Sequence, residues 1–349
     1  MRIIESLPEG DFLLSFEAHT LYFKQASGTS RGVLTEKKLW LLTLKFASND
    51  TNGIGECSVI PGLSPDFTSV QEYENKLTEV CENPQKYLEN TNLLLDFPSI
   101  LFGLESAYLD WKNGGKQIYF DTNFNSGKVK IAINGLIWMG DKTFMEKQIE
   151  EKLAQGFRCL KMKVGAIDFE SELELLKSIR NRFSSDELEL RVDANGAFSI
   201  DQAMNKLERL SQFEIHSIEQ PIKAGSWNEM ADLCRNTPIP IALDEELIGV
   251  NLKEEKNKLL ETIKPQYIIL KPSLHGGFSG SKEWISLAEE KNIPWWMTSA
   301  LESNIGLTAI TQFASTFNND LPQGLGTGSL YTSNFETNLC VENGFIFVR

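Results

Sequence analysis

Two lysines stand one residue apart in the otherwise apolar stretch RCLKMKVG, residues 158–165. Side chains along a β-strand alternate between its two faces, so Lys161 and Lys163 share one face while Leu160 and Met162 share the other. In a strand that stands alone, this pattern is typical of an edge strand with one wet face. Lysine is among the residue types least often buried without a partner. The rest of the chain must therefore decide whether these lysines face solvent or charged partners.

Other predicted strands also end in ionisable or polar residues. Any one of these residues alone is typical of a strand-end side chain that turns to solvent. Burying all of them together without compensation costs several kcal/mol per ion, so we expect that they converge for a chemical purpose. The set consists of Arg191, Asp193 and Asn195 in RVDAN, Glu219 in SIEQP, Asp244 in IALDEE and Lys271 in IILKPS.

Three of these residues are carboxylates that suit one divalent cation. Asp193, Glu219 and Asp244 lie on successive predicted strands. All-oxygen ligand sets that leave positions for water and substrate are typical of Mg²⁺ or Mn²⁺. Such a metal offsets the repulsion between the carboxylates and binds a carboxylate of the substrate. We therefore predict a Mg²⁺ site, with Mn²⁺ as the alternative.

The lysines flank this predicted metal site from two different strands. A nearby cation and desolvation both lower the pKa of a lysine, which makes neutral amine available near neutral pH. We interpret Lys163 as a base supported by the neighbouring cation Lys161, and Lys271 as a lysine on the other side of the substrate. A metal and a lysine together are suited to removing a proton alpha to a carboxylate.

The elements that must position these residues repeat along residues 128–334. Eight strand-like stretches alternate with helical ones, including a helix capped by Asp141 and closed by Gly156 and another capped by Ser199. This alternation predicts an α/β fold with a parallel sheet. The count is that of a (β/α)₈ barrel, whose active sites form at the C-terminal ends of the strands. The last predicted strand, QGLGTGSLY, is rich in glycine and is followed by little helix.

Residues 1–127 do not share this pattern and predict an α+β capping domain packed on the barrel. We expect the C-terminal tail, 335–349, to pack back on this domain. The segments 25–38 and 55–67 are rich in Gly, Ser and Pro, which predicts loops. The expected strands cover 12–25 and 38–47, and the expected helices cover 69–83 and 99–114.

Composition excludes several classes of protein. The 349 residues carry a net charge of −14, with 34 Lys and Arg against 48 Asp and Glu, which disfavours nucleic-acid and anionic-membrane partners. The 5 cysteines are widely spaced, which suggests neither a zinc site nor a disulfide framework and favours the reducing cytoplasm. No apolar run approaches the ~20 residues of a transmembrane helix. We expect a small-molecule carboxylate as the partner and leave the oligomeric state open.

These motifs, in this order, resemble the enolase superfamily, whose members use a Lys or His base with Mg²⁺. The muconate-lactonizing subgroup is the most similar: KMK matches its Lys-x-Lys element, DAN, EQP and DEE its three metal ligands, and LKP its opposite lysine. Each triplet alone is weak evidence, but the combination covers essentially the whole chain. The resemblance implies an enolase-like modified barrel with an α+β cap.

Within the subgroup, the chain resembles the o-succinylbenzoate synthase family of menaquinone biosynthesis. The segments SGTSRGVLTEK and GECSVIPGLSPD are similar to that family's two cap loops over the substrate. The resemblance implies dehydration of 2-succinyl-6-hydroxy-2,4-cyclohexadiene-1-carboxylate, with Lys163 as the base and Lys271 stabilising the enediolate. It also implies substrate contacts, which we expect from Thr29, Arg31, Arg191, Asn195, Ser299 and Gly326.

Several alternatives stay open at this point. Lysines on both sides of a substrate also suit an N-succinylamino acid racemase that uses Lys163 and Lys271 as an opposed acid–base pair. Dipeptide epimerases typically carry an Asp-x-Asp pair at the last strand, where this chain has GLGTG. Muconate cycloisomerisation is a third option. A barrel that binds without catalysis predicts the loss of a lysine or carboxylate, and a phosphate-binding barrel would explain the glycines of GLGTG.

Overall fold

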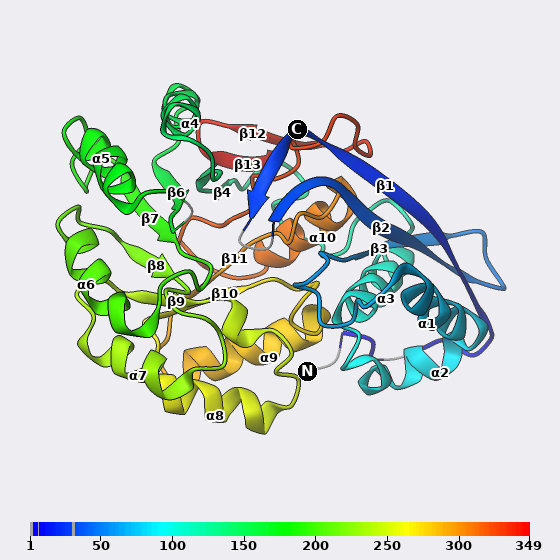
Figure 1. Ribbon diagram of the computed structural model, residues 1–349. Coiled ribbons are helices and arrows are strands. Elements are labelled where there is room, and N and C mark those ends of the chain that lie inside the picture. Colours follow the sequence, from blue (N-terminus) through cyan, green and yellow to red (C-terminus); the bar gives the residue numbers. More distant parts are fainter. Residues whose placement is uncertain (1–2, 6, 30–31, 166) are drawn as a thin grey trace.

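The computed structural model describes residues 3–5, 7–29, 32–165 and 167–349, with the side chains of 26–29 left undescribed. It consists of an antiparallel three-stranded sheet with its own helices and a curled parallel sheet that helices cover on the outside (Figure 1). The prediction of a barrel with an α+β cap is therefore confirmed. No helix in these described ranges is long and apolar enough to cross a membrane.

The capping domain contains the predicted strands and helices, with two corrections. The segment 25–38 is largely strand, because β1 and β2 continue to Thr29 and from Gly32 with the pairs Ser27–Leu34 and Gly28–Val33. Residues 52–58, predicted in part as loop, form β3. Its Gly and Ser composition hides the alternation that marks a strand. The elements are β1 (Phe12–Thr29), β2 (Gly32–Phe46), β3 (Asn52–Ser58), α1 (Val70–Glu82), α2 (Pro84–Glu89), η1 (Thr91–Leu94) and α3 (Pro98–Lys112).

The barrel sheet has seven parallel strands among the described residues, ordered as in the chain. The predicted eighth strand is reduced to two bridges, Ile133–Gln323 and Thr298–Gly324, which join the two ends of the sheet. A Cβ at Gly324 would lie 2.2 Å from the Thr298 hydroxyl oxygen, so this close approach requires glycine. The strands are β5 (Gly135–Ile137), β6 (Cys159–Lys163), β7 (Glu189–Asp193), β8 (Ser217–Glu219), β9 (Ile241–Leu243), β10 (Tyr267–Leu270) and β11 (Trp295–Met297).

Helices follow the strands as the sequence pattern predicts. Asp141 accepts a hydrogen bond from the backbone N–H of Phe144 at 2.9 Å and caps the first of them, and Gly156 ends it at φ +77°. Ser199 occupies the cap position of α6, although its side chain makes no capping hydrogen bond to the described backbone. The helices are α4 (Lys142–Ala154), α5 (Phe169–Arg180), α6 (Ile200–Ser211), α7 (Trp227–Asn236), η2 (Glu245–Leu247), α8 (Lys253–Ile263), α9 (Gly277–Glu290) and α10 (Asn304–Ala314).

Two buried carboxylates of the capping domain, which we call the interface carboxylates, bind the first turns of barrel helices. Glu105 of α3 accepts hydrogen bonds from the backbone N–H groups of Phe278 (2.6 Å) and Ser279 (3.2 Å) of α9. Glu56 of β3 accepts one from the N–H of Ser303 (2.9 Å), at the start of α10. Helix N-termini favour negative charge because their first N–H groups lack intrahelical partners. These contacts attach the cap to the barrel.

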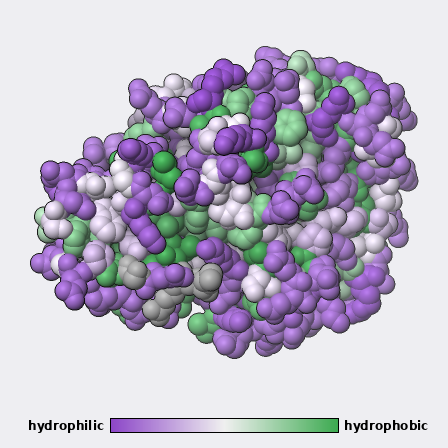
Figure 2. Space-filling model, turned by 180° about the vertical axis from the view of Figure 1, so that it is seen from behind, coloured by the Kyte–Doolittle hydropathy of each residue, from purple (hydrophilic) through white to green (hydrophobic). Residues whose placement is uncertain are grey.

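The C-terminal tail forms a third small sheet. Strands β12 (Leu339–Glu342) and β13 (Phe345–Val348) pair antiparallel, and β13 also pairs with β4 (Ile131–Ala132) beside the first barrel strand (Figure 1). Ahead of these strands, the ring of Phe335 meets His19 of β1 edge-on at 5.2 Å. The face seen in Figure 2 is covered mainly by hydrophilic residues with apolar side chains scattered among them, in keeping with the acidic composition.

Candidate active site

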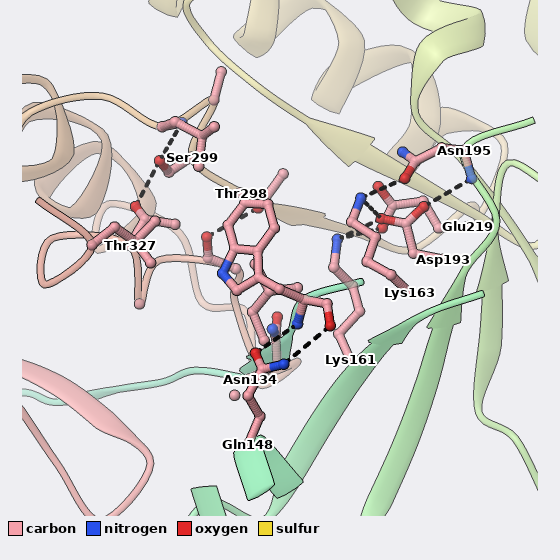
Figure 3. A pocket seen from close by; sticks show the side chains of 18 of the residues that line it. Asn134, Gln148, Lys161, Lys163, Asp193, Asn195, Glu219, Thr298, Ser299 and Thr327 are labelled. Atoms are coloured by element: carbon pink, nitrogen blue, oxygen red, sulfur yellow. Dashed lines mark hydrogen bonds and ion pairs between the residues drawn. The ribbon is translucent and has the colours of Figure 1, made fainter. Parts of the chain in front are cut away.

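A cavity of about 250 Å³ lies where the C-terminal ends of the barrel strands meet the capping domain. Leu34, Ile60 and Leu63 line it from the cap. The barrel contributes most of the polar residues selected from the sequence (Figure 3). These are Lys161, Lys163, Asp193, Asn195, Glu219, Lys271, Ser299 and Gly326.

Three neighbouring strands place two lysines against two carboxylates. The sheet register sets Lys163 beside Asp193 and Asp193 beside Glu219, all at the strand ends. The Lys161 ammonium lies 2.6 Å from Glu219 Oε2 and 3.2 Å from Asp193 Oδ2. The Lys163 ammonium lies 2.7 Å from the same Asp193 oxygen. The lysine side chains therefore face charged partners, which excludes the interpretation of a wet edge strand.

Asn195 connects the base candidate to a further acid. Its Oδ1 accepts a hydrogen bond from Lys163 Nζ at 2.5 Å, and its Nδ2 donates to Glu245 Oε1 at 2.9 Å. The backbone of Asn195 is left-handed, with φ +45°, a conformation that asparagine tolerates better than most residues. Glu245 lines the cavity as well. Sequence reasoning used only the first acid of DEE and missed this one.

Lys271 reaches the cavity from β10, across the curled sheet from β6. Its ammonium forms an ion pair with Asp244 Oδ2. Asp244 itself is fully buried and does not line the cavity directly. The structure therefore brings all three predicted metal ligands and all three lysines into one contiguous cluster.

Opposed charges set the ionisation of this cluster. Burial disfavours charge on Lys161, but the carboxylates of Glu219 and Asp193 raise its pKa above the ordinary value. Burial likewise disfavours charge on Lys271, and Asp244 and Glu219 raise its pKa. Burial together with the nearby Asp193 raises the pKa of Glu219. At Lys161 and Lys271 the carboxylates therefore outweigh the desolvation, in keeping with the interpretation of both as cations.

Two carboxylate oxygens of the cluster are buried without a hydrogen-bond partner among the described residues. They are Glu219 Oε1 and Asp244 Oδ1. Within the described chain no group of three acids, histidines or cysteines is arranged as a ready metal site, and the other oxygens of Glu219 and Asp244 are paired with lysines. Buried polar atoms are almost always satisfied. The open oxygens, on an all-carboxylate set whose members repel one another, fit a divalent cation.

The opposite wall of the cavity is made of hydroxyl groups and glycines. Thr327 Oγ1 donates to Ser299 Oγ at 2.8 Å, and Ser299 Oγ also accepts from the N–H of Leu301 at 2.9 Å (Figure 3). Gly326 lies beside them in the cavity lining. The predicted contacts of Thr29 and Arg31 fall outside the described side chains.

Arg191 is not brought to the cavity. Its guanidinium lies 4.2 Å from the ring centroid of Trp296, its Nε donates to Glu189 at 2.6 Å, and its Nη1 donates to the carbonyl of Pro322 at 2.8 Å. Arg191 shares a strand face with Asp193 but sits one layer deeper in the barrel. The alternation of side chains along a strand predicts on which face of the sheet a residue lies, but not how far it lies from the end of the barrel. For this reason the expected contact between Arg191 and the substrate is wrong.

The chain is similar to known proteins along nearly its whole length. Residues 145–349 match the family described as enolase C-terminal domain-like. An o-succinylbenzoate synthase of Desulfotalea psychrophila is 46% identical over 96% of this chain and 98% of its own length. An N-succinylamino acid racemase of Thermus thermophilus is 30% identical over 80% of this chain and 75% of its own. The crystal structure of MenC from Desulfotalea psychrophila matches with a TM-score of 0.85 at 44% identity, covering 97% of this chain and 99% of that one.

Proposed function

The chain belongs to the enolase superfamily and, within it, to the o-succinylbenzoate synthases, which are lyases, and on this premise we propose how its residues carry out the reaction. The reaction removes water from 2-succinyl-6-hydroxy-2,4-cyclohexadiene-1-carboxylate and leaves 2-succinylbenzoate, in the menaquinone pathway. One observation supports the assignment of roles: Lys163 of β6 and Lys271, directly after β10, line the same cavity. The three carboxylates lie at the ends of the strands between them, Asp193 on β7, Glu219 on β8 and Asp244 directly after β9.

Lys163 is the base in this proposal. It removes the proton alpha to the ring carboxylate, and the C–H electron pair moves onto that carboxylate to give an enediolate. The electron pair then returns, the bond between the ring and the hydroxyl oxygen breaks, and the ammonium of Lys163 gives its proton to the departing hydroxide. Water leaves and the ring becomes aromatic. Lys271, held as a cation by Asp244, stabilises the negative charge of the enediolate.

Asp193, Glu219 and Asp244 would hold Mg²⁺ or Mn²⁺. The buried open oxygens of Glu219 and Asp244 and the mutual repulsion of the carboxylates support this assignment. When bound, the metal supplies positive charge that stabilises the substrate carboxylate as it gains electrons. Lys161 forms ion pairs with Glu219 and Asp193 and offsets part of the negative charge of the carboxylates. Asn195 orients Lys163 through a hydrogen bond.

The succinyl arm of the substrate is proposed to lie against the other wall. Ser299 and the backbone around Gly326 supply hydrogen-bonding groups there. We further propose that residues 1–127 act as the cap and that the segments around Thr29–Arg31 and Gly62–Ser64 cover the substrate, because Ile60 and Leu63 already line the cavity. A cytoplasmic location stays part of the proposal.

The function is tested directly by mixing the protein with the cyclohexadiene substrate and Mg²⁺ and following aromatisation by absorbance. Removing divalent metal with a chelator should abolish turnover, and adding Mg²⁺ or Mn²⁺ should restore it. Full activity of a protein shown to be metal-free would contradict the metal assignment. No aromatisation by the metal-loaded protein would contradict the function itself.

Racemisation of N-succinylamino acids is the second candidate and has less support. The opposed lysines favour it, and the Thermus thermophilus relative carries that name. Replacing Lys271 separates the two reactions. A racemase needs Lys271 to deliver a proton, so Lys271→Arg should abolish solvent deuterium incorporation from one enantiomer. Dehydration needs only its charge, so Lys271→Arg should keep measurable aromatisation.

A further inference from the structure

A glutamine of α4 binds the backbone of one cavity residue at both of its polar groups. Gln148 Oε1 accepts a hydrogen bond from the N–H of Trp138 at 2.9 Å, and Gln148 Nε2 donates to the carbonyl of Trp138 at 3.1 Å (Figure 3). Strand β5 ends at Ile137, and the amide of Gln148 satisfies both backbone polar groups of the residue that follows. These two hydrogen bonds fix where Trp138 leaves the barrel. We call this pair the Gln148 clamp.

Trp138 stands beside the proposed base. The register of β5 and β6 pairs Leu136 with Lys161 and Ile137 with Met162, so the next residue, Trp138, lies level with Lys163. Leu136 and Trp138 share a strand face, and both line the cavity. The clamp thus sets the position of a large aromatic residue at the level where the proton is removed.

The same tryptophan joins an apolar wall that spans both domains. Trp138 and Leu63 both pack against a cluster that includes Ile60 of the cap and Leu301 of the barrel, and all of these line the cavity. The lysines and the hydroxyl groups of Ser299 and Thr327 also line this cavity. A ligand can therefore place a carboxylate against the charged residues and an apolar surface against the wall.

We infer that Trp138 is a specificity-determining residue that favours flat six-membered-ring carboxylates over N-acyl amino acids, and that Gln148 is the positioning residue that acts through it. This inference rests on the proposed function. Dehydration flattens the ring, and planar rings gain stacking energy on an aromatic side chain held at a fixed position. An N-succinylamino acid has a tetrahedral carbon with a flexible branch and gains less from such a surface.

The test compares the binding of two probes, 2-succinylbenzoate and N-succinylvaline, by calorimetry in the presence of Mg²⁺. Gln148→Met keeps the side-chain volume and removes both hydrogen bonds. It should weaken binding of 2-succinylbenzoate about tenfold while changing the binding of N-succinylvaline less than about twofold. Gln148→Glu keeps the acceptor for the Trp138 N–H, so its affinity for 2-succinylbenzoate should lie between those of the wild type and Gln148→Met. Gln155→Met, at the exposed end of the same helix, is the matched control and should leave both affinities unchanged.

A double variant separates positioning from a merely structural role. Because Gln148 acts through Trp138, Gln148→Met combined with Trp138→Leu should be no weaker for 2-succinylbenzoate than Trp138→Leu alone. Additive losses, or equal losses for the two probes, would overturn the inference. If Gln148→Met does not fold by circular dichroism, Gln148→Glu and Trp138→Leu give the same comparison. A wild-type protein that neither binds 2-succinylbenzoate nor aromatises the substrate would instead overturn the proposed function.

Discussion

Two sets of buried carboxylates in this molecule, one at the domain interface and one at the cavity, have different partners. The interface carboxylates, Glu56 and Glu105, are surrounded by donors: Glu56 accepts from the N–H groups of Ser303 and Gly306 and from the Ser303 hydroxyl. Both of its oxygens are used. In the charged cluster at the cavity, Glu219 and Asp244 each use one oxygen on a lysine, and the other oxygen has no hydrogen-bond partner among the described residues.

This difference distinguishes a structural acid from a reactive one. Backbone N–H groups at a helix start are fixed donors, so a carboxylate that they saturate has no capacity for another ligand. A carboxylate shared between a lysine and an open position can exchange partners when a cation or substrate arrives. Glu56, Glu105, Glu219 and Asp244 are all buried, and what distinguishes the interface pair from the cavity pair is that both oxygens of each interface carboxylate accept hydrogen bonds.

The largest expected effect lies in the cavity. Lys163→Ala should lower the rate of aromatisation by roughly 10⁴-fold or more, because general acid–base roles are worth about 10² to 10⁴ and Lys163 serves two proton transfers. The thermal midpoint should change little. Steady-state kinetics and a melting curve measure both. Lys177→Ala, an exposed lysine of α5, is the control. A near wild-type rate in Lys163→Ala would make the lysine pair only a counter-charge for the acids.

The open oxygens are addressed by Asp244→Asn. The loss of charge should raise the Mg²⁺ concentration needed for half-maximal activity about 10- to 100-fold, with the fold retained. Titrating activity with Mg²⁺ gives the value. Asp232→Asn on the exposed face of α7 should leave it unchanged. An unaltered Mg²⁺ requirement in Asp244→Asn would remove this residue from the metal site.

At the interface, the corresponding change should affect stability and leave catalysis nearly intact. Glu56→Ala leaves the buried N–H groups of Ser303 and Gly306 without their hydrogen-bond acceptor, which should lower the free energy of unfolding by about 1–3 kcal/mol. We expect the thermal midpoint to fall by roughly 1–4 °C, while the turnover number at low temperature stays close to that of the wild type. Glu56→Gln keeps one acceptor oxygen, so its thermal midpoint should fall less than that of Glu56→Ala. A collapse of turnover without any change in melting would contradict the structural role.

The interface also predicts a pH dependence of stability. Burial raises the pKa of Glu105 from 4.5 to about 7, outweighing the hydrogen bonds from Ser279 and Phe278. The folded state therefore holds this proton more tightly, so the contribution to stability is complete below pH 4.5 and is lost as the pH rises through 7. The thermal midpoint should decline from pH 5 to pH 8, and the decline should be shallower in Glu105→Gln. Exposed Glu255→Gln is the control, and equal slopes in all three proteins would contradict the assignment.

The residues of the cavity could be predicted because their signal is local. Lys161, Lys163 and Asp193 sit at alternate positions near strand ends, and the motifs around Glu219 and Lys271 resemble those of a known superfamily. Depth within the barrel carries no such signal, and the sequence interpretation therefore misplaced Arg191. The capping hairpin was hidden by its glycine and serine content.

The interface carboxylates and the Gln148 clamp had no local signal at all. Glu105 is one of two acids in a largely apolar helix, and its backbone partners lie 173 and 174 residues further along the chain. Gln148 reads as an ordinary polar residue on a helix. Contacts of this kind depend on which segments the fold brings together, and a single sequence does not contain that information.

The separation of the interface contacts along the chain has a consequence for how the protein is made. Glu56 and Glu105 leave the ribosome early, whereas the helix starts that they bind follow 247 and 173 residues later. Until those residues emerge, two acids that will be buried are exposed on an unfinished surface. Contacts across such long loops form late and slowly. We therefore expect the N-terminal segment to remain partly folded until the second half of the chain has been synthesised. A chain truncated before residue 278 should then expose its cap to proteases and chaperones.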